Sequence, residues 1–302
     1  MRIEQVGANT SCLTGLSLEE SVNAIRQLGF HGLTLLGFSG TRHRYGELAG
    51  FWFRQLANSQ RIELKRLVSG FDRLAIHAPF ADLPLFSYDH RVAQLALERV
   101  KESIDAAQYL RGSVVIVHAN PRANFPVTDY WKDMISTFRL LGDYALERGV
   151  RIGIETGFPN KVNQFVDLLE AVGHRAVGAT IDTGHMARYV DTDLWGTPAG
   201  VNQLNEQLMD VTRQLGIQIL HCHINDLDPS DWRDHRTLGQ GVIDFQPFLA
   251  ELHSVGYDGM LELELEEEIK DQLTTLEESK EELETMIFRL DRLHQASRSG
   301  AA

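Results

Sequence analysis

The stretch VGATIDTGH (177–185) is followed by VNQLNEQLMDVTRQL (201–215) and then by IQILHCHIND (217–226). The first and third segments are short apolar runs that end in polar side chains, whereas the middle segment places Leu and Val at helical spacing. A buried strand, an amphipathic helix and a second buried strand in this order are typical of a parallel β-sheet. This stretch therefore predicts an α/β protein with polar groups at the carboxyl ends of its strands.

The same unit recurs along the whole chain. Strands are expected at 3–7, 33–36, 74–77, 114–118, 151–155, 177–182, 217–223 and 260–265. Helices are expected between them at 18–28, 91–110, 129–147, 162–172, 201–215 and 244–255. Eight strands in 302 residues give about 38 residues per repeat, close to the length of a βαβ unit. The pattern predicts a single (β/α)8 TIM barrel over residues 1–295 and a disordered C-terminal tail over 296–302.

A doubly wound sheet is the competing architecture. Its Gly-rich phosphate turn should follow the first strand, where the sequence reads VGANTSCLTG (6–15) without a G-x-G-x-x-G pattern. The barrel is therefore the better interpretation.

Composition and charge exclude several classes of protein. The chain has 29 Lys and Arg against 42 Asp and Glu, a net charge of −13, and acidic residues gather in 266–284, which we expect to be a solvated helix face. No basic stripe for nucleic acid is present. Cys12 and Cys222 have no zinc-type spacing, and no secretory signal or membrane-spanning run is found. A cytoplasmic protein with no nucleic-acid or membrane partner is expected.

Polar side chains close six consecutive predicted strands. They are His77, His118, Glu155, Asp182 with His185, His221 with His223, and Glu262 with Glu264. In a parallel barrel the carboxyl ends of all strands meet at one mouth, where barrel enzymes place their active sites. Buried carboxylates and imidazoles are costly unless they pair or bind a cation. These residues therefore predict a metal site at the mouth.

Strand parity narrows the set of ligands. Residues two apart share a face of a strand, so the member nearer the carboxyl end reaches the mouth. This favours His223 over His221 and Glu264 over Glu262. His221 is expected to be a histidine inside the barrel that hydrogen-bonds a neighbour.

The predicted ligands are Glu155, Asp182, His223 and Glu264. Three carboxylates and one imidazole make an oxygen-rich site for one divalent ion, with Mn²⁺ as our first choice and Co²⁺, Mg²⁺ or Zn²⁺ as alternatives. The D-x-x-H spacing places His185 beside the site, where we expect it to contact the metal or a substrate.

At these residues the sequence resembles the xylose isomerase-like TIM barrel superfamily, which groups sugar isomerases and epimerases, inosose dehydratases and zinc apurinic endonucleases. The matching stretches are IGIETG (152–157), IDTGHM (181–186), HCHIND (221–226), HRTLGQGVIDF (235–245) and GYDGMLELE (256–264). Their order and spacing are specific for the superfamily, but not for one of its members.

The resemblance implies that one metal is held by Glu155, Asp182, His223 and Glu264. It also implies that Glu155 and Glu264 act as acid and base and that His185 contacts a substrate oxygen. We therefore expect a metal-dependent isomerase or epimerase of a sugar or related polyhydroxy carbonyl compound, acting through an enediolate. Loss of water from the same enediolate would give an inosose-type dehydratase as the alternative.

Further residues are expected to contact a small sugar or polyol-derived substrate. They are His77, His118, His235 and Arg236. The loop Gly239-x-Gly241 is interpreted either as a tight turn or as a phosphate site. A homo-oligomer is possible, since barrel enzymes commonly associate through their helices.

Two further hypotheses assign the protein a function other than a sugar isomerase, epimerase or dehydratase. In the endonuclease branch His77, His118 and His235 would match additional zinc ligands, but Arg233 stands where that branch has an aspartate. One site of a multi-zinc cluster should then lack a ligand, and the acidic net charge also disfavours binding to DNA. A sugar-binding pseudoenzyme is the other hypothesis, and the complete four-ligand set argues against it.

Overall fold

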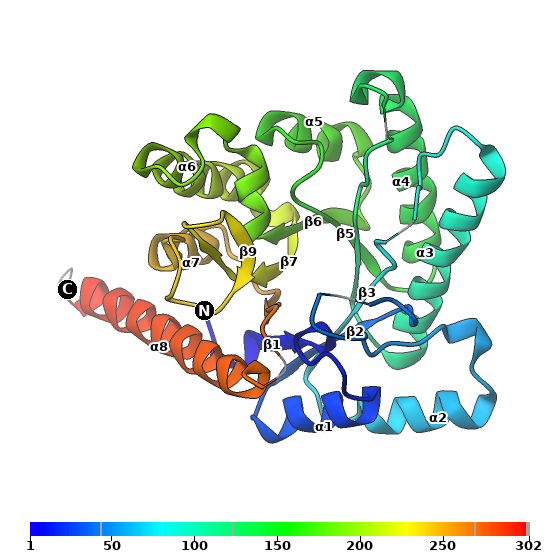
Figure 1. The fold of residues 1–302 in the computed structure, drawn as a ribbon, viewed down its shortest axis with the longest axis horizontal. Helices are drawn as coiled ribbons and strands as arrows, with labels where there is room; N and C mark the ends of the chain where they lie inside the picture. Colours follow the sequence, from blue (N-terminus) through cyan, green and yellow to red (C-terminus); the bar gives the residue numbers. More distant parts are fainter. Residues whose placement is uncertain (43, 82, 123, 269, 300–302) are drawn as a thin grey trace.

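The computed structural model describes residues 1–42, 44–81, 83–122, 124–268 and 270–299. Parallel strands close into a barrel in the order β1-β10-β7-β6-β5-β4-β3-β2 (Figure 1). Their bounds are β1 Val6–Asn9, β2 Gly32–Leu36, β3 Arg73–His77, β4 Val114–Val117, β5 Arg151–Glu155, β6 Val177–Asp182, β7 Ile219–Ile224 and β10 Met260–Leu263. The predicted single (β/α)8 barrel is therefore confirmed.

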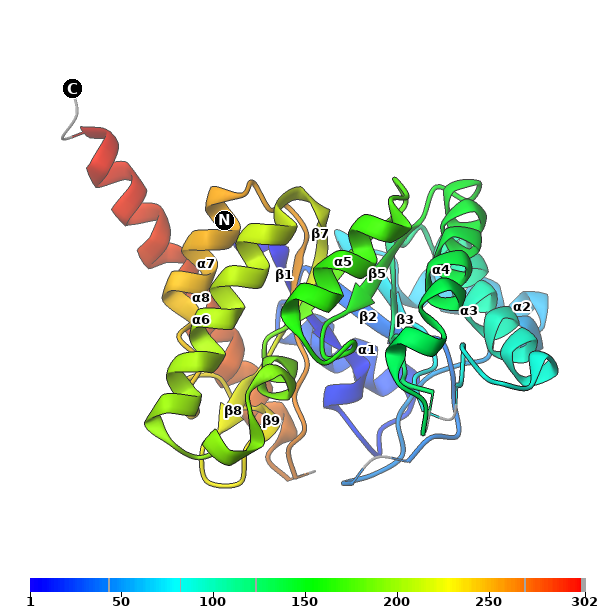
Figure 2. The same ribbon diagram turned by 90° about the horizontal axis from the view of Figure 1, so that it is seen from above.

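Helices surround this barrel on its outside (Figures 1 and 2). They are α1 Leu18–Gln27, α2 Asn58–Leu67, α3 His90–Leu110, α4 Trp131–Leu146, α5 Val162–Val172, α6 Pro198–Leu215, α7 Phe245–Ser254 and α8 Gln272–Ser299. Local sequence signals fix several ends: Ser17 and Glu20 form a capping box at α1, and Gly173 ends α5 in a left-handed conformation. None of the described helices is long and apolar enough to cross a membrane.

The first strand begins later than predicted. Ile3–Gln5 forms a 3-10 turn, because the side chain of Gln5 accepts the backbone N–H of Arg2 at 2.8 Å and donates to the carbonyl of Gly259 at 3.0 Å. The predicted strand at 217–223 likewise starts only at Ile219, after a 3-10 turn over Gly216–Gln218.

The loop after β7 forms a small antiparallel sheet that the sequence did not predict. It consists of β8 Asp226–Asp228 and β9 Arg233–Arg236 and lies at the barrel mouth (Figure 2). At the other end of the molecule α8 projects beyond the barrel body. This helix includes residues 296–299 of the predicted tail, and residues 300–302 lie outside the described residues.

The barrel interior changes from apolar to polar along its axis. Near the floor, Met260 fills the space left by Gly7 and Gly32, where an added Cβ would overlap its sulfur atom. Higher in the barrel, Asp182 and Glu262 are the Cα partners of His223 on its two neighbouring strands. The parallel register therefore brings these charged side chains together inside the barrel.

Candidate functional site

A cavity of about 320 Å³ opens at the carboxyl ends of the barrel strands. Of the residues predicted from the sequence, His77, His118, Glu155, His185, His235 and Glu264 line it. Residues that the sequence reasoning missed also line it, namely Ser11, Leu48, Phe80, Asn120, Arg188, Asp234 and Glu266. A larger surface groove between α1 and α2 contains none of the predicted site residues.

The four predicted metal ligands lie together: Glu155 and Glu264 line this cavity, whereas Asp182 and His223 are fully buried and do not line it. One side-chain atom each of Glu155, Asp182, His223 and Glu264 lies within 4.8 Å of the others. The Nδ1 atom of His223 is 2.8 Å from Glu264 Oε2, 3.5 Å from Asp182 Oδ2 and 3.6 Å from Glu155 Oε1. The imidazole thus presents one nitrogen to all three carboxylates, each of which comes from a different strand or strand end.

Several buried atoms of this set have no hydrogen-bond partner among the residues that the structure describes. They are both carboxylate oxygens of Glu155 and both ring nitrogens of His223, which lie at ion-pair distances but without hydrogen-bond geometry. Buried polar groups are rarely left so, because each lost hydrogen bond is costly. The residues therefore fit a divalent cation, which Nδ1 of His223 and the carboxylate of Glu155 would bind.

The pKa shifts of these residues also favour a bound cation. Burial opposes ionisation of Glu155, but His118 and His223 outweigh it and hold the pKa of Glu155 well below its usual range. The same balance between burial and His223 lowers the pKa of Glu264 to about 2. Burial also opposes a charge on His223, yet Glu264, Glu262 and Glu155 raise its pKa well above the usual value. The carboxylates thus draw positive charge into the centre of the site.

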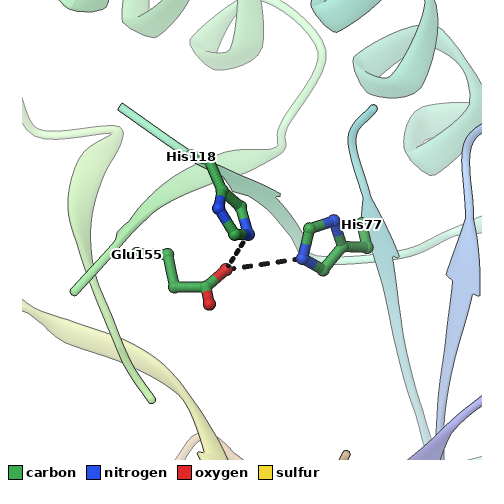
Figure 3. A group of neighbouring side chains, drawn as sticks. All are labelled: His77, His118 and Glu155. Carbon is green, nitrogen blue, oxygen red and sulfur yellow. Dashed lines mark ion pairs between the residues drawn. The ribbon is translucent and has the colours of Figure 1, made fainter. Parts of the chain in front are cut away.

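Glu155 also contacts two histidines on the other side (Figure 3). Its Oε2 atom is 2.7 Å from His118 Nε2 and 3.4 Å from His77 Nε2. Its Oε1 atom lies 2.9 Å from His185 Nδ1. The two oxygens of this carboxylate therefore face different groups of imidazoles, and His77, His118 and Glu155 form a second set with metal-ligand spacing.

A third set of neighbouring groups is formed by Asp182, His185 and His235. The backbone N–H of His185 donates to Asp182 Oδ1 at 2.8 Å, which fixes the D-x-x-H turn. The carboxylate of Asp234 lies 3.8 Å from His185 Nε2. Arg233 itself brings no carboxylate to this set, but the neighbouring residue Asp234 places one beside His185.

Arg236 does not line the cavity. Its guanidinium donates to the backbone carbonyls of Asp234, at 3.0 Å, and Glu266, and it lies 3.4 Å from the carboxylate of Glu267. These contacts hold β9 against the segment after β10. Arg236 was expected to contact a substrate, but its guanidinium is used for these contacts within the protein. Arg188, which is half-exposed and lies 3.9 Å from Asp234, is the arginine at the cavity wall.

The side chain of Asp226 binds the backbone of the Gly239-x-Gly241 loop. The Asp226 carboxylate accepts hydrogen bonds from the backbone N–H groups of Leu227, Gly239, Gly241 and Ile243 at 2.9 to 3.1 Å. These amides are therefore occupied by a side chain of the protein, and the tight-turn interpretation fits the loop better than the phosphate site.

Asp226→Ala is expected to lower the free energy of unfolding by about 3 kcal/mol, because several buried N–H groups lose their charged acceptor. Urea unfolding followed by circular dichroism measures this change. Asp228→Ala is the matched control, since within the described part of the chain the Asp228 carboxylate accepts hydrogen bonds from the exposed Ser230 alone. An equal midpoint for Asp226→Ala and the unchanged protein would contradict the structural role of Asp226.

Comparisons with known proteins agree with this architecture. Residues 22–287 match the sequence profile of the family described as xylose isomerase-like TIM barrel. The uncharacterized protein MJ1311 of Methanocaldococcus jannaschii is 29% identical over 222 residues, which cover 70% of this chain and 70% of that protein. A 3-dehydroshikimate dehydratase of Pseudomonas putida is 26% identical over 267 residues, and the match covers 85% of this chain but only 37% of the dehydratase.

Solved structures show a similar fold. A D-tagatose 3-epimerase-like protein superimposes with a TM-score of 0.72 at 22% identity, covering 95% of this chain and 98% of that chain. A xylose isomerase-like TIM barrel protein from Mycobacterium smegmatis in complex with magnesium gives a TM-score of 0.69 at 16% identity, covering 95% and 97%.

Proposed function

The chain belongs to the xylose isomerase-like TIM barrel family, and from this premise we propose that it is a metal-dependent enzyme that moves a proton beside the carbonyl group of a sugar or related polyhydroxy compound. The observation that carries the proposal is the buried set of Glu155, Asp182, His223 and Glu264, in which Glu155 and His223 retain atoms without hydrogen-bond partners. The names of an epimerase-like protein and a dehydratase among the similar proteins support this class of chemistry.

Glu155, Asp182, His223 and Glu264 would hold the metal, with Mn²⁺ as our first choice and Mg²⁺, Co²⁺ or Zn²⁺ as alternatives. A magnesium complex of a protein with this fold supports a divalent ion in general. When bound, such an ion polarises a carbonyl group and so acidifies the neighbouring C–H group.

Glu155 and Glu264 are suited to transfer the proton. Both are ionised at neutral pH, because their pKa values lie below the usual range, and both line the cavity. Glu264 is oriented by Asn9, whose Nδ2 donates to its Oε1 at 3.0 Å. In this proposal one glutamate removes the proton and the other returns one, while His185 at the cavity wall contacts a substrate oxygen.

The fate of the proton decides the reaction. Delivery of a proton to the opposite face of the same carbon gives epimerisation, delivery to the adjacent carbon gives isomerisation, and loss of a β-hydroxyl group gives dehydration. We place epimerase or isomerase activity first and dehydratase activity second. Either reaction begins with the same exchangeable proton, so one experiment tests both.

Protein treated with EDTA and then reconstituted with Mn²⁺ is expected to hold about one ion per chain and to exchange solvent deuterium into a ketose or inosose. Inductively coupled plasma mass spectrometry measures the metal, and proton NMR of the sugar measures the exchange. The EDTA-treated protein without added metal is the control, in which exchange should be absent. Stable binding of none of the four metals would contradict the proposal.

A second candidate function is hydrolysis at more than one zinc ion, as in the zinc endonuclease hypothesis. It is favoured by the Glu155 carboxylate, whose oxygens face separate groups of imidazoles, and by the carboxylate of Asp234 next to His185. Zinc ions held by these residues would stabilise the attacking and leaving oxygens of a hydrolysis reaction. Two or three zinc ions per chain in the same reconstitution would favour this function over the single-metal enzyme.

A further inference from the structure

A second polar layer lies beneath the predicted ligands, inside the barrel. It consists of Thr34 on β2, His221 on β7 and Glu262 on β10, all fully buried. None of them lines the cavity at the mouth, so none is placed to touch a substrate there. A buried carboxylate at this depth requires partners of its own.

One oxygen of Glu262 is held firmly. Its Oε2 atom accepts a hydrogen bond from the hydroxyl group of Thr34 and lies 2.5 Å from Nε2 of His221. These contacts confirm the prediction that His221 is an interior histidine bonded to a neighbour. They also fix the direction in which the other oxygen of Glu262 points.

The other oxygen of Glu262 faces His223. Glu262 Oε1 and His223 Nε2 are 3.7 Å apart, and both are buried with no hydrogen-bond partner in the described ranges of the chain. The Nδ1 atom on the far side of the same ring faces Glu264, Asp182 and Glu155. The ring of His223 is therefore placed between the ligand set and Glu262.

We propose that Glu262 is a positioning residue that accepts the Nε2–H group of His223 and thereby directs Nδ1 of this ring to the metal. This inference rests on the proposed function, because it assigns His223 as a ligand. A carboxylate behind a metal-bound histidine fixes the ring orientation and its tautomer and makes the other nitrogen a better ligand. Thr34 and His221 hold Glu262 in place for this role.

The affinity for Mn²⁺ tests the role of Glu262. Calorimetric titration of the metal-free full chain with Mn²⁺ is expected to give a Kd that is about 10-fold to 100-fold weaker for Glu262→Gln than for the unchanged protein. The glutamine has nearly the same shape but lacks the charge. Equal Kd values in the two folded proteins would overturn the inference while leaving the proposed function intact.

A second pair of variants tests the inference without removing a buried charge, and so applies even if Glu262→Gln does not fold. Thr34→Val removes the hydroxyl group that holds Glu262 and is expected to weaken Mn²⁺ binding about 3-fold to 10-fold, as a fraction of the loss expected for the carboxylate. Thr180→Val is the matched control, since the Thr180 hydroxyl is equally buried on β6 but has no hydrogen-bond partner. Equal weakening by both valine variants would overturn the inference.

The ring of His223 provides a readout that a merely structural role of Glu262 would not move. In the Zn²⁺-loaded protein, ¹H–¹⁵N correlation spectra of the histidine rings are expected to show the proton of His223 on Nε2. A proton on Nδ1 overturns the inference. The inference would also be overturned if the unchanged protein bound two metal ions and Glu262→Gln bound only one. In that case His221, His223 and Glu262 would themselves form a cation site. Absence of binding by the unchanged protein would overturn the proposed function as well.

Discussion

Glu264→Gln is expected to lower kcat for deuterium exchange by about 10³-fold, within the range found when a general acid or base is removed. The glutamine oxygen can still accept the hydrogen bond from Asn9, so the side chain keeps its place at the cavity wall. It cannot accept a proton at neutral pH. The chemical step should therefore fail while the far-UV circular dichroism spectrum remains that of the unchanged protein.

The rate at saturating Mn²⁺ separates the role of Glu264 in proton transfer from its role in metal binding, because weaker binding is compensated there and only the chemical defect remains. Glu268→Gln is the matched control, since it makes the same chemical change on an exposed side chain paired with Lys270. Near-normal exchange by Glu264→Gln at saturating Mn²⁺ would refute its assignment as acid or base.

The polar ends of the strands could be predicted from the sequence because strand geometry is simple. Side chains alternate with a period of two, and parallel strands bring their carboxyl ends to one face. This was sufficient to separate His223, which faces the ligand set, from His221, which bonds Glu262 in the deeper layer. Helix α2 was missed because its sequence NSQRIELKRL buries only Leu64 and so has little apolar periodicity.

The loop after β7 could not be predicted in the same way. Trp232 and His235 adopt positive φ angles of 57° and 58°, a conformation that residues other than glycine seldom adopt and that no sequence signal announces here. The resulting turn brings Asp234 to His185 and directs Arg236 away from the cavity. The spacing of the motif carries no information on this turn, so it suggested a substrate contact for Arg236 and gave no expectation for Asp234.

His223→Ala is expected to abolish the stabilisation that Mn²⁺ gives the folded protein. A ligand at about 1,000 times its Kd stabilises a protein by about 4 kcal/mol, whereas a 10³-fold weaker Kd leaves only about 0.4 kcal/mol at the same concentration. His223 offers the only imidazole nitrogen of the four-residue set, and this nitrogen faces all three carboxylates. Thermal unfolding with and without Mn²⁺ measures the difference.

The metal-free form of each protein is the reference for this experiment. Without a cation, the neighbouring carboxylates raise the pKa of His223 well above its usual value, so the ring is a buried cation paired with Glu264 and Glu155. Removing the ring is therefore expected to lower the stability of the metal-free protein as well, and the result that tests the metal site is the change that Mn²⁺ makes in each protein relative to its own metal-free form. His31→Ala, which removes a half-exposed imidazole paired with Asp72, should respond to Mn²⁺ like the unchanged protein. An undiminished response in His223→Ala would mean that the stabilising ion binds elsewhere, for example along the acidic residues 266–284, and that the barrel site is not the metal centre.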